Sequence, residues 1–431
     1  MFEILVNTLW ILASIMIFLC GIYFSLKFKF IHLNFKKMWQ AIKQGSENEG
    51  SISAFQSLTM SLAGRIGVGS LSGIALAVYL GGAGVLFWIW LTSILCAIVA
   101  LVESVLAVVF RKKDGKNIYR GGPFYYIKDG LGKRRLAILY ATIVIISYIG
   151  GFMTMQVNTV TKCINEVVSI NPTVIGVIIA IIAGITIFGG VKKIANVTSK
   201  LVPIMTVAYV AICGYIIIVN NGMIKDILVE IINSALNFKS LGIGVISTLL
   251  IGMQKGIFSS EVGLGTGAIA AVTADTKNAI DNGLVQTFGI HIENILFATI
   301  TTFVVCMANY KNIIINDANG IEITLYAFRY HIGNFGAIFV TVTITLFALA
   351  TVLAGYYYGE SSLKFIKKTN KLDLIVLKLT TMAVIVIGST ISSNLLWLIV
   401  DILVGILAII NIYALFGLKD IALDEYKNYK S

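Results

Sequence analysis

Long apolar segments recur through almost the whole 431-residue chain, with only short polar stretches between them. About 20 apolar residues are enough for a helix to cross the ~30 Å hydrocarbon core of a bilayer. Charged residues make up 13% of the chain and apolar residues 58%, whereas soluble domains contain about 25% charged residues. The sequence therefore predicts an all-α integral membrane protein and argues against a soluble enzyme.

Eleven apolar segments can be delimited, and an odd number places the two termini on opposite sides of the membrane. The segments are residues 4–26, 52–80, 84–110, 136–161, 172–189, 201–219, 241–270, 283–307, 334–358, 374–390 and 392–416. If the N-terminus is outside, the inside loops hold 25 of the 33 basic residues and the outside loops hold 5. Basic residues collect in cytoplasmic loops. We therefore expect an outside N-terminus and a cytoplasmic C-terminus in the cell membrane, and the net charge of +12 needs no nucleic-acid partner.

The first apolar segment has neither a basic leader nor a small-residue cleavage motif, so we expect it to be a membrane helix and not a signal peptide. The five cysteines are scattered through apolar stretches without a CxxC pair. They indicate neither a zinc site nor a disulfide framework.

Two apolar segments are unusually rich in glycine. Residues 64–73 read GRIGVGSLSG, and residues 252–267 read GMQKGIFSSEVGLGTG. Glycine weakens helices and allows unusual backbone angles, so both helices are expected to break near the middle of the membrane. Such backbone is tolerated there only when it is buried in protein or lines a wet cavity. Close helix packing is the alternative explanation for the glycines.

The positions of the two glycine-rich segments divide the chain into matching halves. Each is followed by four unbroken apolar segments, which gives a five-plus-five arrangement in which the second half enters from the opposite face. Broken helices at matching positions of inverted halves point to the binding site of a secondary transporter. We expect an extra N-terminal helix and basic segment (residues 1–51), a first five-helix repeat (52–240) and a second repeat with a short tail (241–431).

At these two breaks the chain resembles the alanine/glycine:cation symporter family, also called sodium:alanine symporters. The motifs that carry the resemblance are GVGSLSGIALA at 67–77, GGAG at 81–84, FWIW at 87–90, GGPFYYI at 121–127, QVN at 156–158, GIFSSEVGLG at 256–265 and YYGE at 357–360. The resemblance implies an amino acid-polyamine-cation type fold of 11 transmembrane helices. It also implies sodium-coupled symport of small neutral amino acids such as alanine and glycine, and of serine or somewhat larger ones.

Several positions depart from the family pattern. Ser70 and Ala83 stand where relatives have Asn and Pro, and Glu293 stands where an Asp is usual. Gly355 stands where many relatives have Trp. These changes leave the expected fold intact but leave the exact substrate open.

The resemblance implies a substrate site at both breaks and on two further helices. The implied substrate-binding residues are Gly67, Val68, Gly69, Ser70, Gln156, Gly256, Phe258, Ser259 and Gly355. Backbone N–H groups at a helix start suit the carboxylate of an amino acid. Ser70, and Ser259 or Ser260, are therefore expected either to cap the second halves of the broken helices or to satisfy their own helix ends.

Two of these residues also have a structural alternative. The Gln156 amide is expected either to accept from the substrate ammonium or to form an interhelical hydrogen bond. Phe258 is expected to act as a wall beside a small side chain or as ordinary packing.

Sodium is a hard cation that prefers oxygen ligands. By resemblance, carbonyls near Gly64 to Gly67 and the Thr351 hydroxyl would bind it, while Ala350 occupies a second family hydroxyl position. Proton coupling therefore stays open.

Ionisable residues inside the apolar segments are costly and are functional candidates. Lys255 and Glu261 are expected to pair or to serve a structural or gating role. Arg65 is expected to point away from an ion site, toward Glu103 or the cytoplasm. Glu103, Glu360 and Lys378 are expected to reach toward the cytoplasmic surface. Asp401 lies mid-segment without an assigned partner.

Other function classes lack their sequence signatures. His291 lies in a segment without a GxSxG or HExxH companion, which argues against an embedded enzyme. No repeated filter-like segment indicates a channel. The expected partners are a small neutral amino acid, a sodium ion and membrane lipid, with no cofactor. Oligomeric state and ion stoichiometry stay open.

Overall fold

The computed structural model describes residues 2–45, 48, 51–115, 118–236, 243–276, 278–310, 320–391 and 394–430. Helices account for most of this structure. Those of the first half are α1 (Phe2–Lys27), α2 (Phe35–Lys43), α3 (Ala54–Arg65), α4 (Ile74–Gly81), α5 (Val85–Val109), α6 (Pro123–Tyr125), α7 (Arg134–Ile145), α8 (Met153–Asn165), α9 (Pro172–Ile187), α10 (Gly190–Val219) and α11 (Ile224–Leu236).

The second half of the chain is also mainly helical. Its helices are α12 (Ile243–Ser260), α13 (Thr266–Ala271), α14 (Ala279–His291), α15 (Ala298–Met307), α16 (Ile321–Ile366), α17 (Lys371–Gly388), α18 (Asn394–Gly417) and α19 (Lys419–Lys430). Two short strands, β1 (Lys112–Lys113) and β2 (Tyr119–Arg120), form an antiparallel hairpin.

Short 3-10 and π segments interrupt or join these helices. They are η1 (Ile31–Leu33), η2 (Gly69–Gly73), η3 (Tyr126–Gly130), η4 (Ile146–Phe152), η5 (Asn221–Met223) and η7 (Ile292–Phe297). Of these, η2, η4 and η7 are π segments inside long apolar helices. Such π turns occur frequently at functional sites.

Within the described residues, seven helices are long and apolar enough to cross a membrane, or eight if α3 and α4 count as one bent span. The seven are Leu5–Lys27, Val85–Val109, Arg134–Asn165, Gly190–Val219, Ala279–Met307, Ile321–Ile366 and Leu396–Gly417. Helix α9 is apolar but shorter. Each of the eleven apolar segments overlaps a helix in the described part of the chain, so the helical prediction is confirmed while the count of eleven spans stays a prediction.

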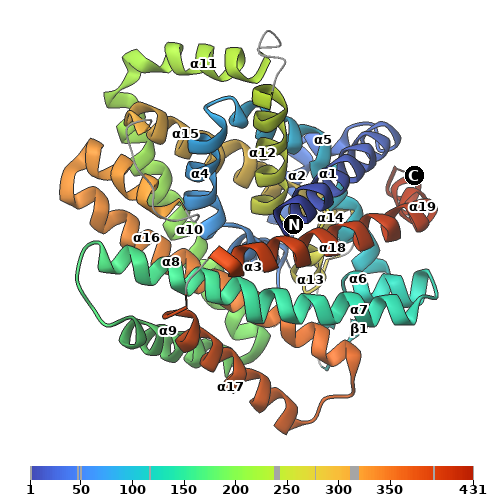
Figure 1. Ribbon diagram of the computed structural model, residues 1–431. Coiled ribbons are helices and arrows are strands. Elements are labelled where there is room, and N and C mark those ends of the chain that lie inside the picture. The colour runs from blue at the N-terminus through green and yellow to red at the C-terminus, as the bar shows by residue number, and fades with distance from the viewer. Residues whose placement is uncertain are drawn as a thin grey trace.

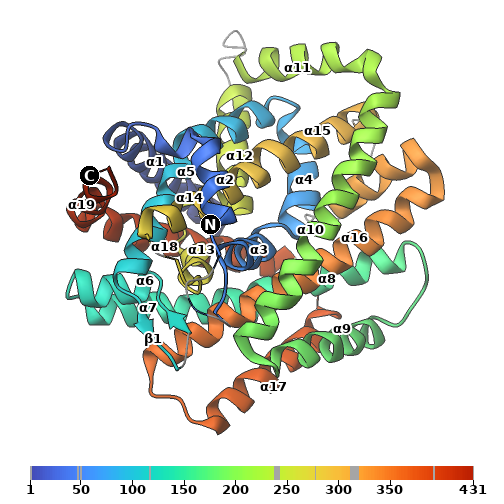
Figure 2. The same cartoon turned by 180° about the vertical axis from the view of Figure 1, so that it is seen from behind.

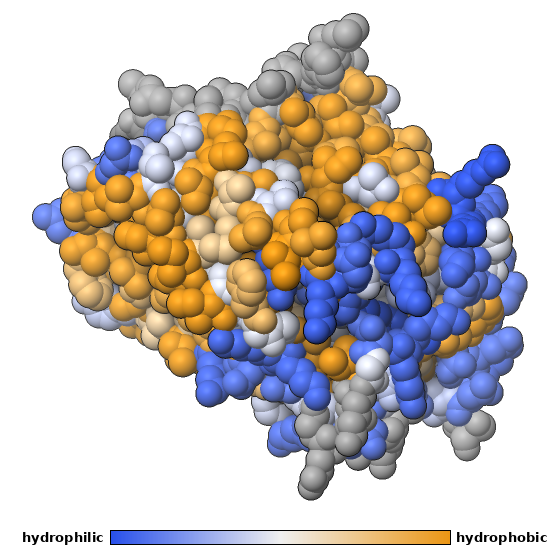
Figure 3. Space-filling view, turned by 90° about the horizontal axis from the view of Figure 1, so that it is seen from below, coloured by the Kyte–Doolittle hydropathy of each residue, from blue (hydrophilic) through white to orange (hydrophobic). Residues whose placement is uncertain are grey.

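Apolar side chains cover much of the outer surface. Ile204 and Ile218 on α10 are 69% and 71% exposed, and Ile185 on α9 is 62% exposed. Figure 3 shows hydrophobic residues gathered over one broad region and hydrophilic residues along another border. This distribution suits helices that face lipid along their length and water at one end.

The helices pack around α5 and α16. Helix α5 lies against α12 and α14, and α16 lies against α7 and α8. Helices α9 and α17 pair at one edge, as both ribbon views show (Figures 1 and 2). One side of the molecule carries the β1–β2 hairpin, the end of α16 and helix α19, and we call it the hairpin side. Helix α11 lies far from β1, at the opposite end of Figure 1.

The first break separates α3 from η2 and α4, whose axes differ by 53°. Helix α3 begins with a capping box in which Ser53 and Gln56 each bond the other's backbone. It ends at Arg65, because Ile66 is extended (φ −79°, ψ 100°). The glycine-rich segment at 64–73 therefore breaks as predicted.

The second break lies between Ser260 and Thr266. Glu261, Gly263 and Gly265 all have positive φ, at 55°, 81° and 81°. Gly265 is the N-cap residue of α13, so no side chain caps the start of this helix. A break within 252–267 was predicted, and the glycines with left-handed backbone place it at the end of that range.

Candidate functional site

A small closed cavity lies where the two breaks meet η4, α8 and α18. It is lined by Gly64, Arg65, Val68, Gly69, Phe152, Met155, Gln156, Phe258, Ser259, Glu261 and Trp397. The cavity measures about 10 Å³, close to the minimum that one water molecule needs. A bound amino acid would therefore require the lining side chains to move apart.

Most of the residues expected at the substrate site come together here. Gly64, Val68, Gly69, Gln156, Phe258 and Ser259 line the cavity. Gly67 lies beside it: an added Cβ would be 2.6 Å from Thr351 Oγ1 and 3.1 Å from Gln156 Oε1. The first break, α8 and α16 thus converge on one glycine that has no room for a side chain.

Gln156 holds the first break in place. Its Oε1 accepts a hydrogen bond from the Val68 backbone N–H at 3.1 Å. This is the interhelical bond that the sequence offered as one of two roles. A carbonyl oxygen has a second lone pair, so the amide still has capacity for another donor at the cavity.

Ser70 does not cap the second half of the first broken helix, since Val68 is the N-cap residue of η2 and Ser70 lies inside the π turn. The Ser70 hydroxyl donates to Arg65 O at 3.2 Å and accepts from Gly67 N at 3.4 Å. It therefore joins the two sides of the break, which is the alternative role of satisfying its own helix end.

The serines of the second broken helix do not cap its second half either. Ser260 Oγ donates back to Gly256 O at 2.5 Å, and Ser259 Oγ donates to Asn294 Oδ1 at 3.4 Å. Both belong to the last turn of α12, because the glycine turn comes after them. Of the two expected roles, Ser260 therefore has the alternative one of satisfying its own helix end.

Besides Gly67, Ser70 and Thr351, the expected site residues Gly256 and Gly355 also lie outside the cavity lining. An added Cβ on Gly256 would be 3.2 Å from Thr92 Cβ, so this glycine permits close packing of α12 on α5. An added Cβ on Gly355 would be 3.6 Å from both Met153 and Tyr148. In this conformation Gly355 faces those two side chains.

Thr351, for which the resemblance implies a role as an ion ligand, lies beside Gly67 of the first break. It is buried on α16, and its hydroxyl donates to Phe347 O at 3.1 Å. The hydroxyl hydrogen is thus engaged along its own helix, and the oxygen lone pairs remain toward Gly67. Gly64 approaches the Tyr358 hydroxyl, which would lie 2.8 Å from an added Cβ.

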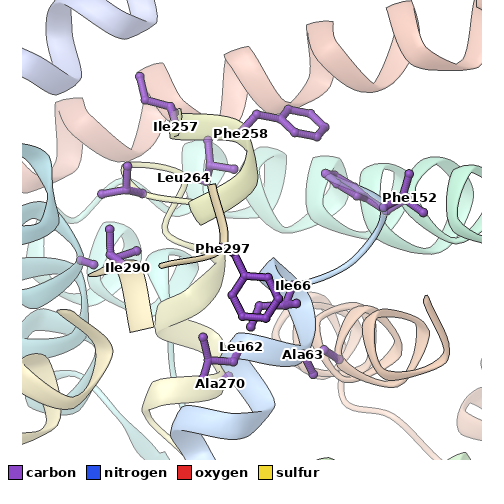
Figure 4. Close-up of a cluster of buried hydrophobic side chains, with 14 of the residues drawn as sticks. Leu62, Ala63, Ile66, Phe152, Ile257, Phe258, Leu264, Ala270, Ile290 and Phe297 are labelled. Atoms are coloured by element: carbon purple, nitrogen blue, oxygen red, sulfur yellow. The ribbon is translucent and has the colours of Figure 1, made fainter. Parts of the chain in front are cut away.

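An aromatic cluster closes one side of the cavity. The Phe258 ring lies 5.5 Å from Phe152, 6.2 Å from Trp397 and 6.2 Å from Trp10. Figure 4 shows Phe152 and Phe258 approaching each other from different elements. Phe152 and Trp397 were not predicted, although Phe152 precedes Gln156 by four residues and so shares its helix face.

Arg65 lies between two glycines of other helices. A Cβ added to Gly267 would lie 2.4 Å from the Arg65 guanidinium, and a Cβ added to Gly289 would lie 2.6 Å from it. Arg65 Nη1 donates to Gln286 O at 3.3 Å, and its charge acts on Glu103, Glu261 and Glu293. The head group thus turns toward α13 and α14.

Lys255 and Glu261 have different partners, contrary to the expected pair. The Lys255 ammonium lies over the rings of Phe258 and Trp397 at 5.6 and 5.7 Å, and its charge acts on Asp401. Glu261 instead accepts from Tyr148 at 2.5 Å and Thr266 at 3.1 Å. Lys255 is thus a cation near Asp401, although Asp401 Oδ1 has no hydrogen-bond partner among the described residues.

Glu103 and Glu360 are both buried rather than reaching to the surface. Glu103 accepts from Gly265 N at 3.1 Å and Asn411 Nδ2 at 2.6 Å. Glu360 pairs with Arg120 at 2.6 Å on the hairpin side.

Arg120 and Lys364 also contact Asp114, in the loop beside the hairpin. Burial raises the pKa of Asp114, but hydrogen bonds from these two cations outweigh it and hold the pKa below its usual value. The carboxylate therefore stays ionised and ties the hairpin to the end of α16.

The whole chain, residues 1–431, matches the profile of the sodium:alanine symporter family. The chain belongs to this family. It is 33% identical over 411 residues to the amino-acid carrier protein AlsT of Bacillus subtilis, covering 95% of this chain and 87% of the relative. It is 32% identical over 422 residues to the sodium/alanine symporter AgcS of Methanococcus maripaludis, covering 95% and 92%.

The fold is similar to a solved structure of a Na⁺-coupled sialic acid symporter in a substrate-bound outward-open state. The TM-score is 0.54 at 14% identity, and the match covers 94% of this chain and 82% of the other. At this identity the likeness concerns the fold alone. Together with its apolar helices, membership of the sodium:alanine symporter family makes this protein a multi-pass membrane transporter and not an enzyme.

Proposed function

We propose that this protein carries small neutral amino acids into the cell together with sodium, by alternating access. The observation that carries the proposal is the convergence of the first break, Gln156 and Thr351 on Gly67, where substrate and ion groups meet within one side chain's reach. Two solutes bound this closely can each raise the affinity of the protein for the other.

The proposed substrate is alanine or glycine, with serine or somewhat larger neutral amino acids as further candidates. The small cavity and its aromatic wall favour a short side chain. Backbone N–H groups of η2 would face the substrate carboxylate and the Gln156 oxygen its ammonium. We assign Gly64, Gly67 and Thr351 to sodium, and Val68, Gly69, Gln156, Phe258 and Ser259 to substrate.

In the proposed topology the protein has eleven membrane helices in an inverted five-plus-five arrangement after α1. The hairpin side is cytoplasmic and the N-terminus lies outside the cell. Basic residues of the 111–135 loop and the Arg120 cluster lie on that side, in line with the preference of basic loops for the cytoplasm.

The test is uptake of labelled alanine by purified protein in liposomes. An inward sodium gradient should concentrate alanine above its external level, and replacing sodium by potassium should abolish this. Competition by the twenty amino acids would define the substrate range. Accumulation that ignores sodium but collapses with a protonophore would favour proton coupling, and mere equilibration would indicate a channel.

A further inference from the structure

Glu293 is a buried carboxylate next to the cavity, and it shares the charge of Arg65 with two other glutamates. It lies in the π segment η7, its side chain is completely buried, and neither carboxylate oxygen has a hydrogen-bond partner among the described residues. The carboxylate faces the hydroxyls of Ser70 and Ser259. An ionised buried carboxylate without hydrogen bonds or a counter-charge is strongly unfavourable.

Each of the two hydroxyls that face Glu293 also has another acceptor. Ser70 already donates to Arg65 O, and Ser259 already donates to Asn294 Oδ1. The orientation of Asn294 is fixed because its Nδ2 donates to Gly256 O at 3.1 Å. A serine hydroxyl has one hydrogen and two lone pairs, so with their hydrogens in these bonds both oxygens can join the carboxylate as ligands of a cation.

The charge balance of the surrounding region leads to the same conclusion. Glu103, Glu261 and Glu293 all feel the single guanidinium of Arg65. Glu103 and Glu261 also accept two hydrogen bonds each from protein donors. Of the three glutamates, Glu293 is thus the one that could bind an added cation. Tyr209 on α10 is a further ionisable side chain near it.

We propose that Glu293, Ser70 and Ser259 bind one monovalent cation, sodium or a proton, that moves with the substrate. Ser259 also lines the cavity, so the cation would lie beside the bound amino acid and apart from Thr351. The proposal rests on the proposed symport and adds a second positive charge to its cycle.

The experiment measures the positive charge moved per alanine from reversal potentials in liposomes. Glu293→Gln keeps the size of the side chain and should move one charge fewer per alanine than the wild type. Glu293→Asp should keep the wild-type ratio. Glu166→Gln makes the same change at an exposed position and should also leave the ratio unchanged.

Two arms identify the cation. If sodium occupies the site, Glu293→Gln should weaken the dependence of the reversal potential on the sodium gradient. If a proton occupies it, the dependence on the pH gradient should disappear instead. A ratio and both dependences that match the wild type would overturn the proposal, while wild-type uptake without any cation dependence would overturn the proposed function itself.

A Glu293→Gln protein that does not transport is tested by binding in detergent. Bound ²²Na⁺ and the protons exchanged on alanine binding are counted in the variant and the wild type. One sodium or one proton fewer supports the site, and equal counts overturn it. Ser259→Ala keeps the carboxylate and should weaken cation binding severalfold without changing the count.

Discussion

The two breaks are built from the same kind of residue but solve different problems. At the first break, Gly69 has space around it: an added Cβ would lie 3.9 Å from the nearest atom, on Ser259. At the second break, a Cβ added to Gly263 would lie 2.7 Å from Ile17, and a Cβ added to Gly265 would lie 2.4 Å from Pro123. Gly69 of the first break faces the cavity, whereas the glycines of the second break pack against α1 and the start of α6.

This difference indicates that the first break serves ligand binding and the second serves the stability of the fold. The first break is closed by one hydroxyl and one amide, from Ser70 and Gln156, which a ligand can rearrange. The second depends on left-handed backbone that side chains rarely adopt. We therefore expect changes at the first break to alter ligand affinity and changes at the second to alter folding.

The largest effect is expected at Gly265. Gly265→Val places a branched side chain at φ 81° against Pro123 and Asn411. Strain and overpacking together should cost about 2–5 kcal/mol. Size-exclusion chromatography in detergent should show little monodisperse protein. A wild-type yield and elution profile would mean that the second break is not the rigid one.

A second stability effect should come from His32, which follows α1. Burial lowers the pKa of His32 to about 4. The hydrogen bond to Ile94 O raises the pKa in part, and the nearby His291 lowers it slightly further. An unfolded histidine binds its proton below about pH 6.5. The folded protein does so only near pH 4, so the free energy of unfolding should fall as the pH drops between these values, by about 3 kcal/mol.

Thermal unfolding in detergent between pH 7.5 and 4.5 measures this loss. His32→Gln keeps a donor for Ile94 O but does not titrate, so its profile should be flatter. A wild-type slope in the variant would assign the pH dependence to other groups.

At the first break, Gly69→Val should leave the fold intact and remove alanine binding. The added methyl groups enter a cavity of about 10 Å³, so we expect an affinity loss of at least about tenfold, or ~1.4 kcal/mol. Gly73→Val is the matched control, because no atom lies within 4 Å of an added Cβ there. Normal alanine affinity in Gly69→Val would place the substrate elsewhere.

A smaller effect is expected for the ion. Thr351→Ala removes one oxygen beside Gly67 and should raise the sodium concentration for half-maximal uptake by up to about tenfold, or ~1.4 kcal/mol. Thr345→Ala is the control, because Thr345 also bonds the carbonyl four residues earlier. Equal sodium dependence in both variants would remove Thr351 from the ion site.

The sequence predicted those features of the fold that depend on residues close together in the chain. The apolar segments overlap helices, and residues 64–73 break where the glycines indicate. The end of the second break was less certain, because Gly256 and Gly263 look alike in sequence although one packs inside a helix and the other turns the chain. Only the backbone angles separate them.

The site could be predicted only in part. Gly67, Gln156 and Thr351 were identified through motifs, and they meet. Phe152 and Trp397 look like ordinary apolar residues of membrane helices, so nothing local marks them as cavity walls. The slot that holds Arg65 is made by Gly267 and Gly289, more than 200 residues away, and a single sequence does not reveal such a contact.

The central claim is that amino acid and sodium bind together at the first break. Its most direct test is equilibrium binding of labelled alanine to the purified protein over a range of sodium concentrations, with potassium keeping the ionic strength constant. We predict that alanine affinity rises with sodium, and that alanine raises ²²Na⁺ affinity by the same factor, as linkage requires. An alanine affinity that is the same with and without sodium would contradict the account.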